Sequence, residues 1–162
     1  MSGFVINLLS ATVSAATVFI LAGLGELISE RAGVLNLGVE GMMLVGALTG
    51  FITTFLTGNY WFGFLIGSLC GAVLSLLHAF LCVSLKADQA ISGIMITLLG
   101  TGLTTYFGSE WTSKSISGFP DIPLPLIGQY LVDIPALGPI LFRNPATDYL
   151  ALLLLPLVWA FL

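Results

Sequence analysis

Charge is what this sequence has least of. Of its 162 residues, four are Lys or Arg and eight are Asp or Glu, so that 7% are charged while 57% are hydrophobic. A soluble domain carries roughly 25% charged residues, because it needs them to cover its surface. The composition therefore excludes a soluble globular domain. It predicts an integral membrane protein whose main solvent is the lipid bilayer.

Three further scarcities exclude other kinds of protein. Lys and Arg form no cluster and the net charge is -4, which excludes a nucleic-acid partner. The two cysteines, Cys70 and Cys82, fall in one predicted helix about 18 Å apart, too far for a disulfide. His78 is the only histidine and has no second ligand at metal-binding spacing, so we predict a packing histidine, no metal site and no cofactor. Neither a phosphate-binding glycine loop nor a serine nucleophile motif is present, and no catalytic residue is predicted.

Long apolar runs are abundant. A membrane-spanning helix needs about 20 residues, and the segments 4–27, 33–56, 60–85 and 89–108 satisfy this. A fifth apolar segment begins near Asp148 and is still apolar at Leu162. We expect an all-α, polytopic transmembrane bundle that forms a single domain over 1–162. It should have about five spans, with the fifth truncated.

The long connection 109–147 holds six of the seven prolines, which favours extended or turn structure. Trp111 and Tyr130 suit a position at the membrane interface. Positive charge in short loops favours the cytoplasm, and Arg31 and Lys86 lie in two such loops. We therefore expect the N-terminus outside and the connection 109–147 to be extracytoplasmic.

Small residues recur every four positions in the third and fourth segments. Lipid offers no hydrophobic force between helices, so that small residues at this spacing indicate close helix contacts. Lining a path is the minority interpretation for the glycines, whereas the threonines could both pack and line a path. The packing candidates are Gly63, Gly67, Gly71, Gly93, Thr97 and Thr101.

Glu40 stands out because it lies inside the second apolar segment. If a helix starts near Gly33, Glu40 is about 10 Å into the membrane, and Asn36 shares its face at a spacing of four. The glycines at 33, 38 and 41 favour a broken or re-entrant start, as in many transporters. Two interpretations stay open. Glu40 is either a hydrogen-bonded packing residue or part of the lining of a polar path.

Other polar residues lie at predicted helix ends. We expect Arg31 to form an ion pair with Glu26 or Glu30, with Glu40 as the alternative. Asp88 precedes the fourth segment and is predicted to cap it.

Gln89 and Ser92 lie on one face at the start of that segment and either pack or border a path. The candidate path residues are therefore Asn36, Glu40, Gly41, Gln89 and Ser92.

Three blocks of sequence resemble one family. "ERAGVLNLGVEGMMLVGA" (30–47) is similar to the N-terminal signature of ABC transporter permeases for nucleosides and simple sugars, which are related to branched-chain amino-acid and ribose permeases. "ADQAISGIMITLLGTGLTTYF" (87–107) and "IPALGPILFRNPATDYLALLLLPLVW" (134–159) resemble the next two characteristic stretches. The resemblance covers the N-terminal part of such a permease.

The resemblance implies a multi-pass subunit in the plasma membrane of a prokaryote. Its partners would be cytoplasmic ABC ATPase subunits, a second permease subunit in a homo- or heterodimer, and an extracytoplasmic solute-binding protein. It places the region 36–41 near the translocation path. ATP hydrolysis would belong to the partner subunit, and the chain itself would not be an enzyme.

Three functions remain open at this stage. The leading hypothesis is import of nucleosides, and the second is import of simple sugars or branched-chain amino acids. The path candidates are mostly small and neutral, with one acid, which disfavours amino acids because these need paired charges. The same residues do not separate a sugar from a nucleoside. The third is a non-transporting membrane scaffold, in which Glu40 and Asn36 would have no purpose.

Overall fold

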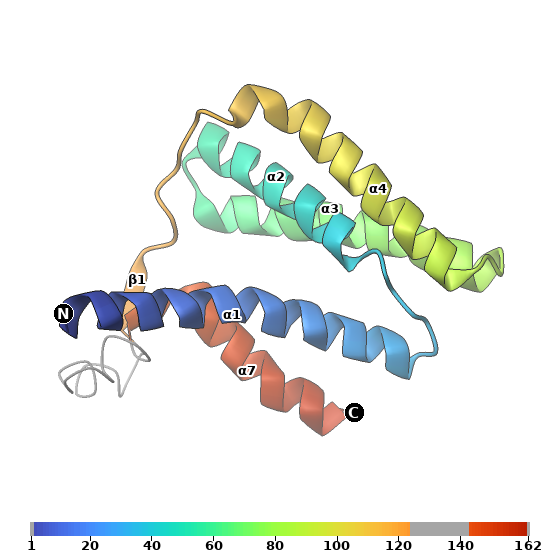
Figure 1. Ribbon diagram of the computed structural model, residues 1–162, viewed down its shortest axis with the longest axis horizontal. Coiled ribbons are helices and arrows are strands. Elements are labelled where there is room, and N and C mark those ends of the chain that lie inside the picture. The colour runs from blue at the N-terminus through green and yellow to red at the C-terminus, as the bar shows by residue number, and fades with distance from the viewer. Residues whose placement is uncertain (1, 124–142, 162) are drawn as a thin grey trace. The chain divides into compact units, whose positions relative to one another are not determined.

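The computed structural model describes residues 2–123 and 143–161, and helices make up most of it (Figure 1). The main helices are α1 (Ser2–Arg31), α2 (Val39–Thr57), α3 (Tyr60–Ala79), α4 (Gln89–Gly108) and α7 (Ala146–Phe161). Among the described residues, four helices are long and apolar enough to cross a membrane, and α7 is a shorter apolar helix. The expected all-α polytopic bundle is confirmed. Tyr130 lies outside the described residues.

Local chemistry explains most helix boundaries. Gly58, in the left-handed conformation at φ 68°, ends α2, and the Asn59 side chain accepts hydrogen bonds from the first amides of α3. The Asp88 carboxylate accepts from the N–H of Ile91 at 2.9 Å, which confirms the predicted cap of α4. The α-helical part of the third span ends at Ala79 and continues as one π-helical turn, Phe80–Ser84.

The predicted start of the second span is wrong. It was placed at Gly33, but α2 begins at Val39. Gly33 has φ 84°, a conformation that glycine adopts without steric cost, and its N–H bonds back to Glu30 at the end of α1. The chain then runs without helix to Gly38.

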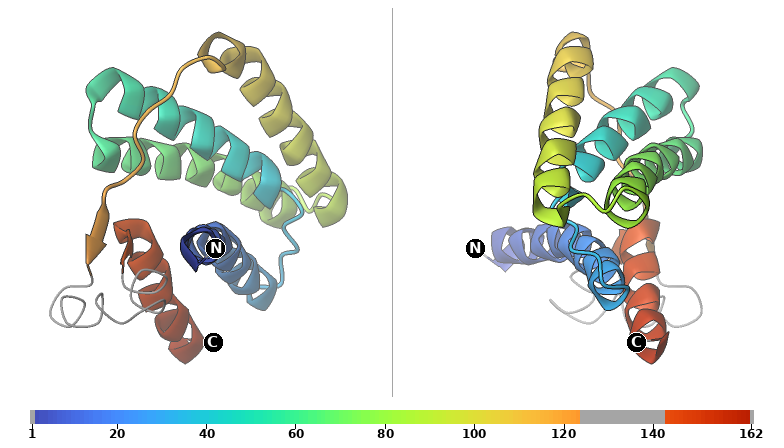
Figure 2. Two further views of the ribbon diagram at one scale, coloured as in Figure 1. Left: turned by 60° about the vertical axis from the view of Figure 1, so that its left-hand side comes forward. Right: turned by 90° about the vertical axis from the view of Figure 1, so that its right-hand side faces the viewer.

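The chain divides into two compact units, Met1–Gly25 with Phe119–Leu162, and Glu26–Gly118. In the second unit, α2 lies between α3 and α4 (Figure 2). Met42, Leu74 and Ile96, one from each helix, form its small buried core. The described cysteines are free, as expected.

The contact between α2 and α3 is made by glycines. A Cβ on Gly67 would lie 2.6 Å from the carbonyl oxygen of Gly46, and one on Gly63 would meet Thr54 and the backbone of Gly50. These distances are shorter than real Cβ atoms show, so neither glycine can be replaced without moving a helix. Gly71 is less crowded, because a Cβ there would lie 3.5 Å from the Met42 carbonyl oxygen.

The contact between α2 and α4 is equally close. A Cβ on Gly41 would lie 2.5 Å from the Ile96 carbonyl oxygen, and one on Gly100 would meet the backbone of Gly41. The structure thus places Gly41, a candidate for the path, in the contact with α4. Thr101 is exposed, and its hydroxyl donates to the carbonyl of Thr97 in the preceding turn.

In the other unit, a buried carboxylate joins α1 and α7. Asp148, in the first turn of α7, is 4% exposed and accepts a hydrogen bond from the Ser14 hydroxyl at 2.7 Å. Ahead of α7, β2 (Arg143–Pro145) pairs antiparallel with β1 (Asp121–Pro123). Sequence reasoning took Asp148 only as the start of a span and missed this contact.

The turn between the third and fourth spans carries backbone strain. Lys86 has φ 53°, a left-handed conformation that costs a non-glycine residue about 1 kcal/mol or more. We expect Lys86→Gly to raise the free energy of unfolding by about 0.5 kcal/mol, because glycine removes that strain but is more flexible when unfolded.

Thermal unfolding of the purified protein in detergent would measure this effect. Lys86→Ala is the matched control, since it removes the same charge and keeps the strain. Equal unfolding midpoints for the two variants would contradict the prediction.

Candidate functional site

The most unusual feature of the Glu26–Gly118 unit is the non-helical segment 32–38 between α1 and α2, called here the break. It lies at the end of the unit where α3 finishes and α4 begins. Backbone amides and carbonyls outside a helix need other partners, above all in a membrane, where water is absent. Carbonyls at the end of α1 accept from the first three amides of the break, and side chains from α1, α3 and α4 make six further bonds to its backbone.

Gln89 makes two of these bonds from the first residue of α4. Its Oε1 accepts from the N–H of Leu35 at 2.8 Å, and its Nε2 donates to the carbonyl of Gly33 at 3.1 Å. The amide therefore pairs with backbone groups on both sides of Val34. Val34 is itself held by Ser29, whose hydroxyl donates to the Val34 carbonyl at 2.9 Å.

His78 holds the same segment from α3. It is 2% exposed, with Nε2 at 3.3 Å from the carbonyl oxygen of Leu35 and Nδ1 at 3.0 Å from the Ser92 hydroxyl. Since a carbonyl can only accept, Nε2 carries the proton, and in the neutral ring Nδ1 accepts from Ser92. The expectation of a hydrogen-bonded packing histidine is confirmed, and Ser92 is its partner.

Glu26 and Thr97 complete the network. The Glu26 Oε1 atom accepts from the N–H of Asn36 at 3.0 Å, and the Thr97 hydroxyl donates to the carbonyl of Leu37 at 3.1 Å. The second carboxylate oxygen of Glu26 is buried and has no hydrogen-bond partner among the described residues. On α4, Gly93 allows the break to approach, because a Cβ there would lie 2.9 Å from the Leu37 nitrogen.

The ion pair expected at this end is absent. Over residues 2–123 and 143–161, Arg31 is exposed and pairs with none of Glu26, Glu30 or Glu40. Glu26 is buried in part and bonds the backbone of Asn36, whereas the Arg31 side chain is exposed.

Asn36 and Glu40 do not share a helix face, because Asn36 lies before the helix begins. The Asn36 Oδ1 atom accepts from the N–H of Gly38 at 3.1 Å, and its Nδ2 lies 3.7 Å from the Met42 sulfur. Glu40 lies in the first turn of α2 and is exposed. A carboxylate there is favoured by the helix dipole. Gly38 is at the cap position and has no side chain that could bond the first amides of α2.

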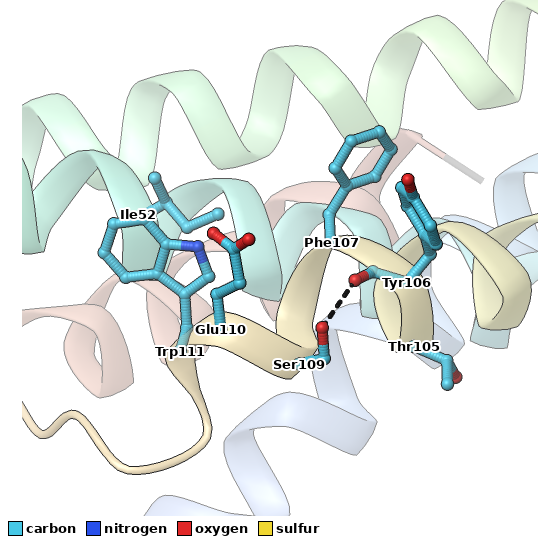
Figure 3. Close-up of a pocket in the computed structure, with 7 residues that line it drawn as sticks. All are labelled: Ile52, Thr105, Tyr106, Phe107, Ser109, Glu110 and Trp111. Atoms are coloured by element: carbon cyan, nitrogen blue, oxygen red, sulfur yellow. Dashed lines mark hydrogen bonds between the residues drawn. The ribbon is translucent and has the colours of Figure 1, made fainter.

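A second feature is an open cavity of about 640 Å³ at the other end of α4 (Figure 3). It is lined by Ile52, Thr105, Tyr106, Phe107, Ser109, Glu110 and Trp111, none of which was a path candidate. Next to it, the Lys114 ammonium lies 3.9 Å from the Trp111 ring centroid, and Phe55 packs edge-on against the same ring at 5.4 Å. Aromatic residues with polar groups are typical of a membrane interface.

Comparison with known proteins identifies the family. The family described as "Branched-chain amino acid transport system / permease component" matches residues 8–162. The chain is 66% identical over 159 residues to a proposed glucose ABC transporter permease of Haloferax volcanii, covering 98% of this chain and 48% of that protein.

Two further relatives are more distant. A guanosine ABC transporter permease of Bacillus subtilis is 34% identical, covering 96% of this chain and 52% of that protein. A nucleoside ABC transporter permease of Lactococcus lactis is 30% identical, covering 89% and 48%. The chain spans about half the length of these relatives, and no solved structure matches it. With its apolar helices and this match, the chain is a multi-pass membrane protein that belongs to the branched-chain amino acid transport system permease family.

Proposed function

We propose that the chain is part of the membrane subunit of an ABC importer that carries a small, neutral, hydroxylated solute across a prokaryotic plasma membrane. The observation that supports this most directly is the break between α1 and α2. Transporters place such interrupted helices beside their solute sites, where irregular backbone borders a cavity. Its partners would be cytoplasmic ATPase subunits, a second permease subunit and an extracytoplasmic binding protein.

The orientation follows from the same end of the bundle. The break follows the end of α1, which carries Arg31, and is hydrogen-bonded to Gln89 at the start of α4, just after Lys86. Both cations thus lie at one end of the Glu26–Gly118 unit, and the positive-inside rule assigns this end to the cytoplasm. The cavity near Trp111 would then open on the extracytoplasmic side.

Glu40 is our candidate for the solute path. Because α2 begins at Val39 and not at Gly33, Glu40 is the second residue of the helix and lies at its end, in place of the expected depth of about 10 Å. It is an exposed carboxylate, and an ionisable group in a membrane protein needs water or a polar partner. A polar path beside α2 provides the water or solute hydroxyls that it needs. Asn36 and Gly41 lie next to this turn but are engaged in local packing.

A simple sugar is the solute we put first. The support is the 66% identity to the relative named for glucose, while the relatives named for guanosine and nucleosides are 34% and 30% identical. Sugars and nucleosides both present hydroxyl groups, from which a carboxylate can accept hydrogen bonds. An amino-acid solute would need a cation as well, and the sequence has no Lys or Arg between Arg31 and Lys86.

Uptake by cells that carry the intact locus would test this function. Labelled glucose should accumulate in an ATP-dependent manner, with excess unlabelled guanosine and leucine having no effect. Competition by guanosine would move the solute to nucleosides and leave the permease assignment standing. The absence of ATP-dependent uptake for glucose, guanosine and leucine would count against an importer.

The role of Glu40 can be tested with one substitution. We expect Glu40→Gln to lower uptake about tenfold, the effect of losing one hydrogen bond to a charged group worth about 1.5 kcal/mol. Glu30→Gln is the matched control, because Glu30 is an exposed carboxylate at the end of α1. The initial rate of solute uptake at equal protein levels is the measurement. Equal rates for the two variants would remove Glu40 from the path.

A further inference from the structure

We propose that Gln89 is a positioning residue, which fixes where α2 begins and so where Glu40 stands, and that it does not contact the solute. The inference rests on the proposed importer function only for its effect on uptake. Its structural part stands on the hydrogen bonds of the break.

The first argument is that both ends of the Gln89 amide are occupied. The oxygen accepts from Leu35 and the nitrogen donates to Gly33, so that the plane and direction of the amide are fixed by the backbone of the break. The side chain is half-buried. Its hydrogen bonds match those that a neighbouring strand would make to the same backbone, which holds the segment in one conformation.

The second argument is that hydrogen bonds fix the backbone between the Gln89 contact and the start of α2. Leu35 is bound by Gln89 and by His78, and Leu37 by Thr97. The Asn36 side chain then bonds to the N–H of Gly38, immediately before α2 begins.

The position of the first turn of α2 is therefore set by these bonds together with the contact that Gly41 makes with α4. The Glu40 side chain makes no hydrogen bond or ion pair to another described residue, so its place depends on how the backbone of this first turn is held.

Gln89→Glu is the sharpest test, because it keeps the size of the side chain and changes one nitrogen to oxygen. The carboxylate loses the bond to Gly33 and faces that carbonyl with a second acceptor. In the complete transporter in lipid nanodiscs, we expect the amides of residues 34–38 to exchange with deuterium about tenfold faster than in the wild type at the same pH.

Lowering the pH should reverse the effect of Gln89→Glu on exchange. A protonated carboxyl has an O–H donor and a carbonyl acceptor, which can replace the two bonds that the amide makes here. The difference in exchange between Gln89→Glu and the wild type should therefore shrink as the pH is lowered. Asp88→Asn is the control, since it changes the charge by one at the adjacent position and keeps an acceptor for the N–H of Ile91.

Uptake separates positioning from solute contact. A positioning role predicts a maximal rate about tenfold lower with an unchanged KM, because an intact binding protein still delivers solute. A raised KM with unchanged exchange would show that Gln89 contacts solute and would overturn the proposal. If no solute is taken up even by the wild type, the importer assignment fails, and the exchange comparison still decides the structural part.

Should Gln89→Glu fail to accumulate, Gln89→Met takes its place in the exchange comparison. Faster exchange is again the expected result, and unchanged exchange would overturn the proposal.

Discussion

Gly100→Ala should destabilise the protein by about 3 kcal/mol, near the upper end of what an added methyl group costs in a packed interior. The Cβ would meet the backbone of Gly41 on the facing helix, and a backbone cannot rotate away as a side chain does. The two helices must separate, which also loosens the buried core around Met42 and Ile96. The midpoint of thermal unfolding in detergent and the amount of protein in the membrane would both fall.

The control is Gly102→Ala, two residues further along α4. A Cβ at Gly102 has nothing within 4 Å among the described residues, and alanine favours the helix more than glycine does. We expect this variant to unfold at or slightly above the wild-type temperature. If Gly100→Ala and Gly102→Ala are equally stable, the close contact between α2 and α4 is wrong.

His78→Leu should destabilise the protein by about 3 kcal/mol. Leucine fills a similar volume but leaves the carbonyl of Leu35 without its donor and the Ser92 hydroxyl without its acceptor, in a site that is 2% exposed. A buried polar group that loses its partner costs about 1–3 kcal/mol. The free energy of unfolding by denaturant in mixed micelles is the measurement.

His78→Gln separates hydrogen bonding from volume. Its amide has a donor for Leu35 and an acceptor for Ser92, so that we expect it to recover at least half of the loss. A glutamine variant no more stable than the leucine variant would mean that the histidine acts by filling space.

The apolar pattern was enough to predict the spans. In a membrane, an apolar run of about twenty residues forms a helix, because its backbone groups must bond within the segment. The helix α4 runs from Gln89 to Gly108 as expected, and Asp88 caps its first turn. The glycines at 33, 38 and 41 indicated a broken start, but the residue at which α2 begins was missed because Val34, Leu35 and Leu37 are as apolar as a helix requires. Only the left-handed glycine at 33 and distant polar partners keep this segment out of the helix.

The polar network was visible in the sequence only as separate residues. Asn36, Gln89 and Ser92 were singled out because they are polar in apolar surroundings, and all three contact the break or its histidine. That Glu26 would bind a backbone amide in place of Arg31 could not be predicted. Such a choice depends on the path of the chain after α1, which spacing along a helix does not describe.

The break also has a consequence for how the protein is made. Its backbone groups at Gly33, Leu35 and Leu37 find partners 43 to 60 residues later in the chain, on α3 and α4. When the ribosome has released only the first two spans, these groups have no partner from the protein. Until α3 and α4 are in place, only water can bond these groups, so the break can be completed only after the fourth span has been made.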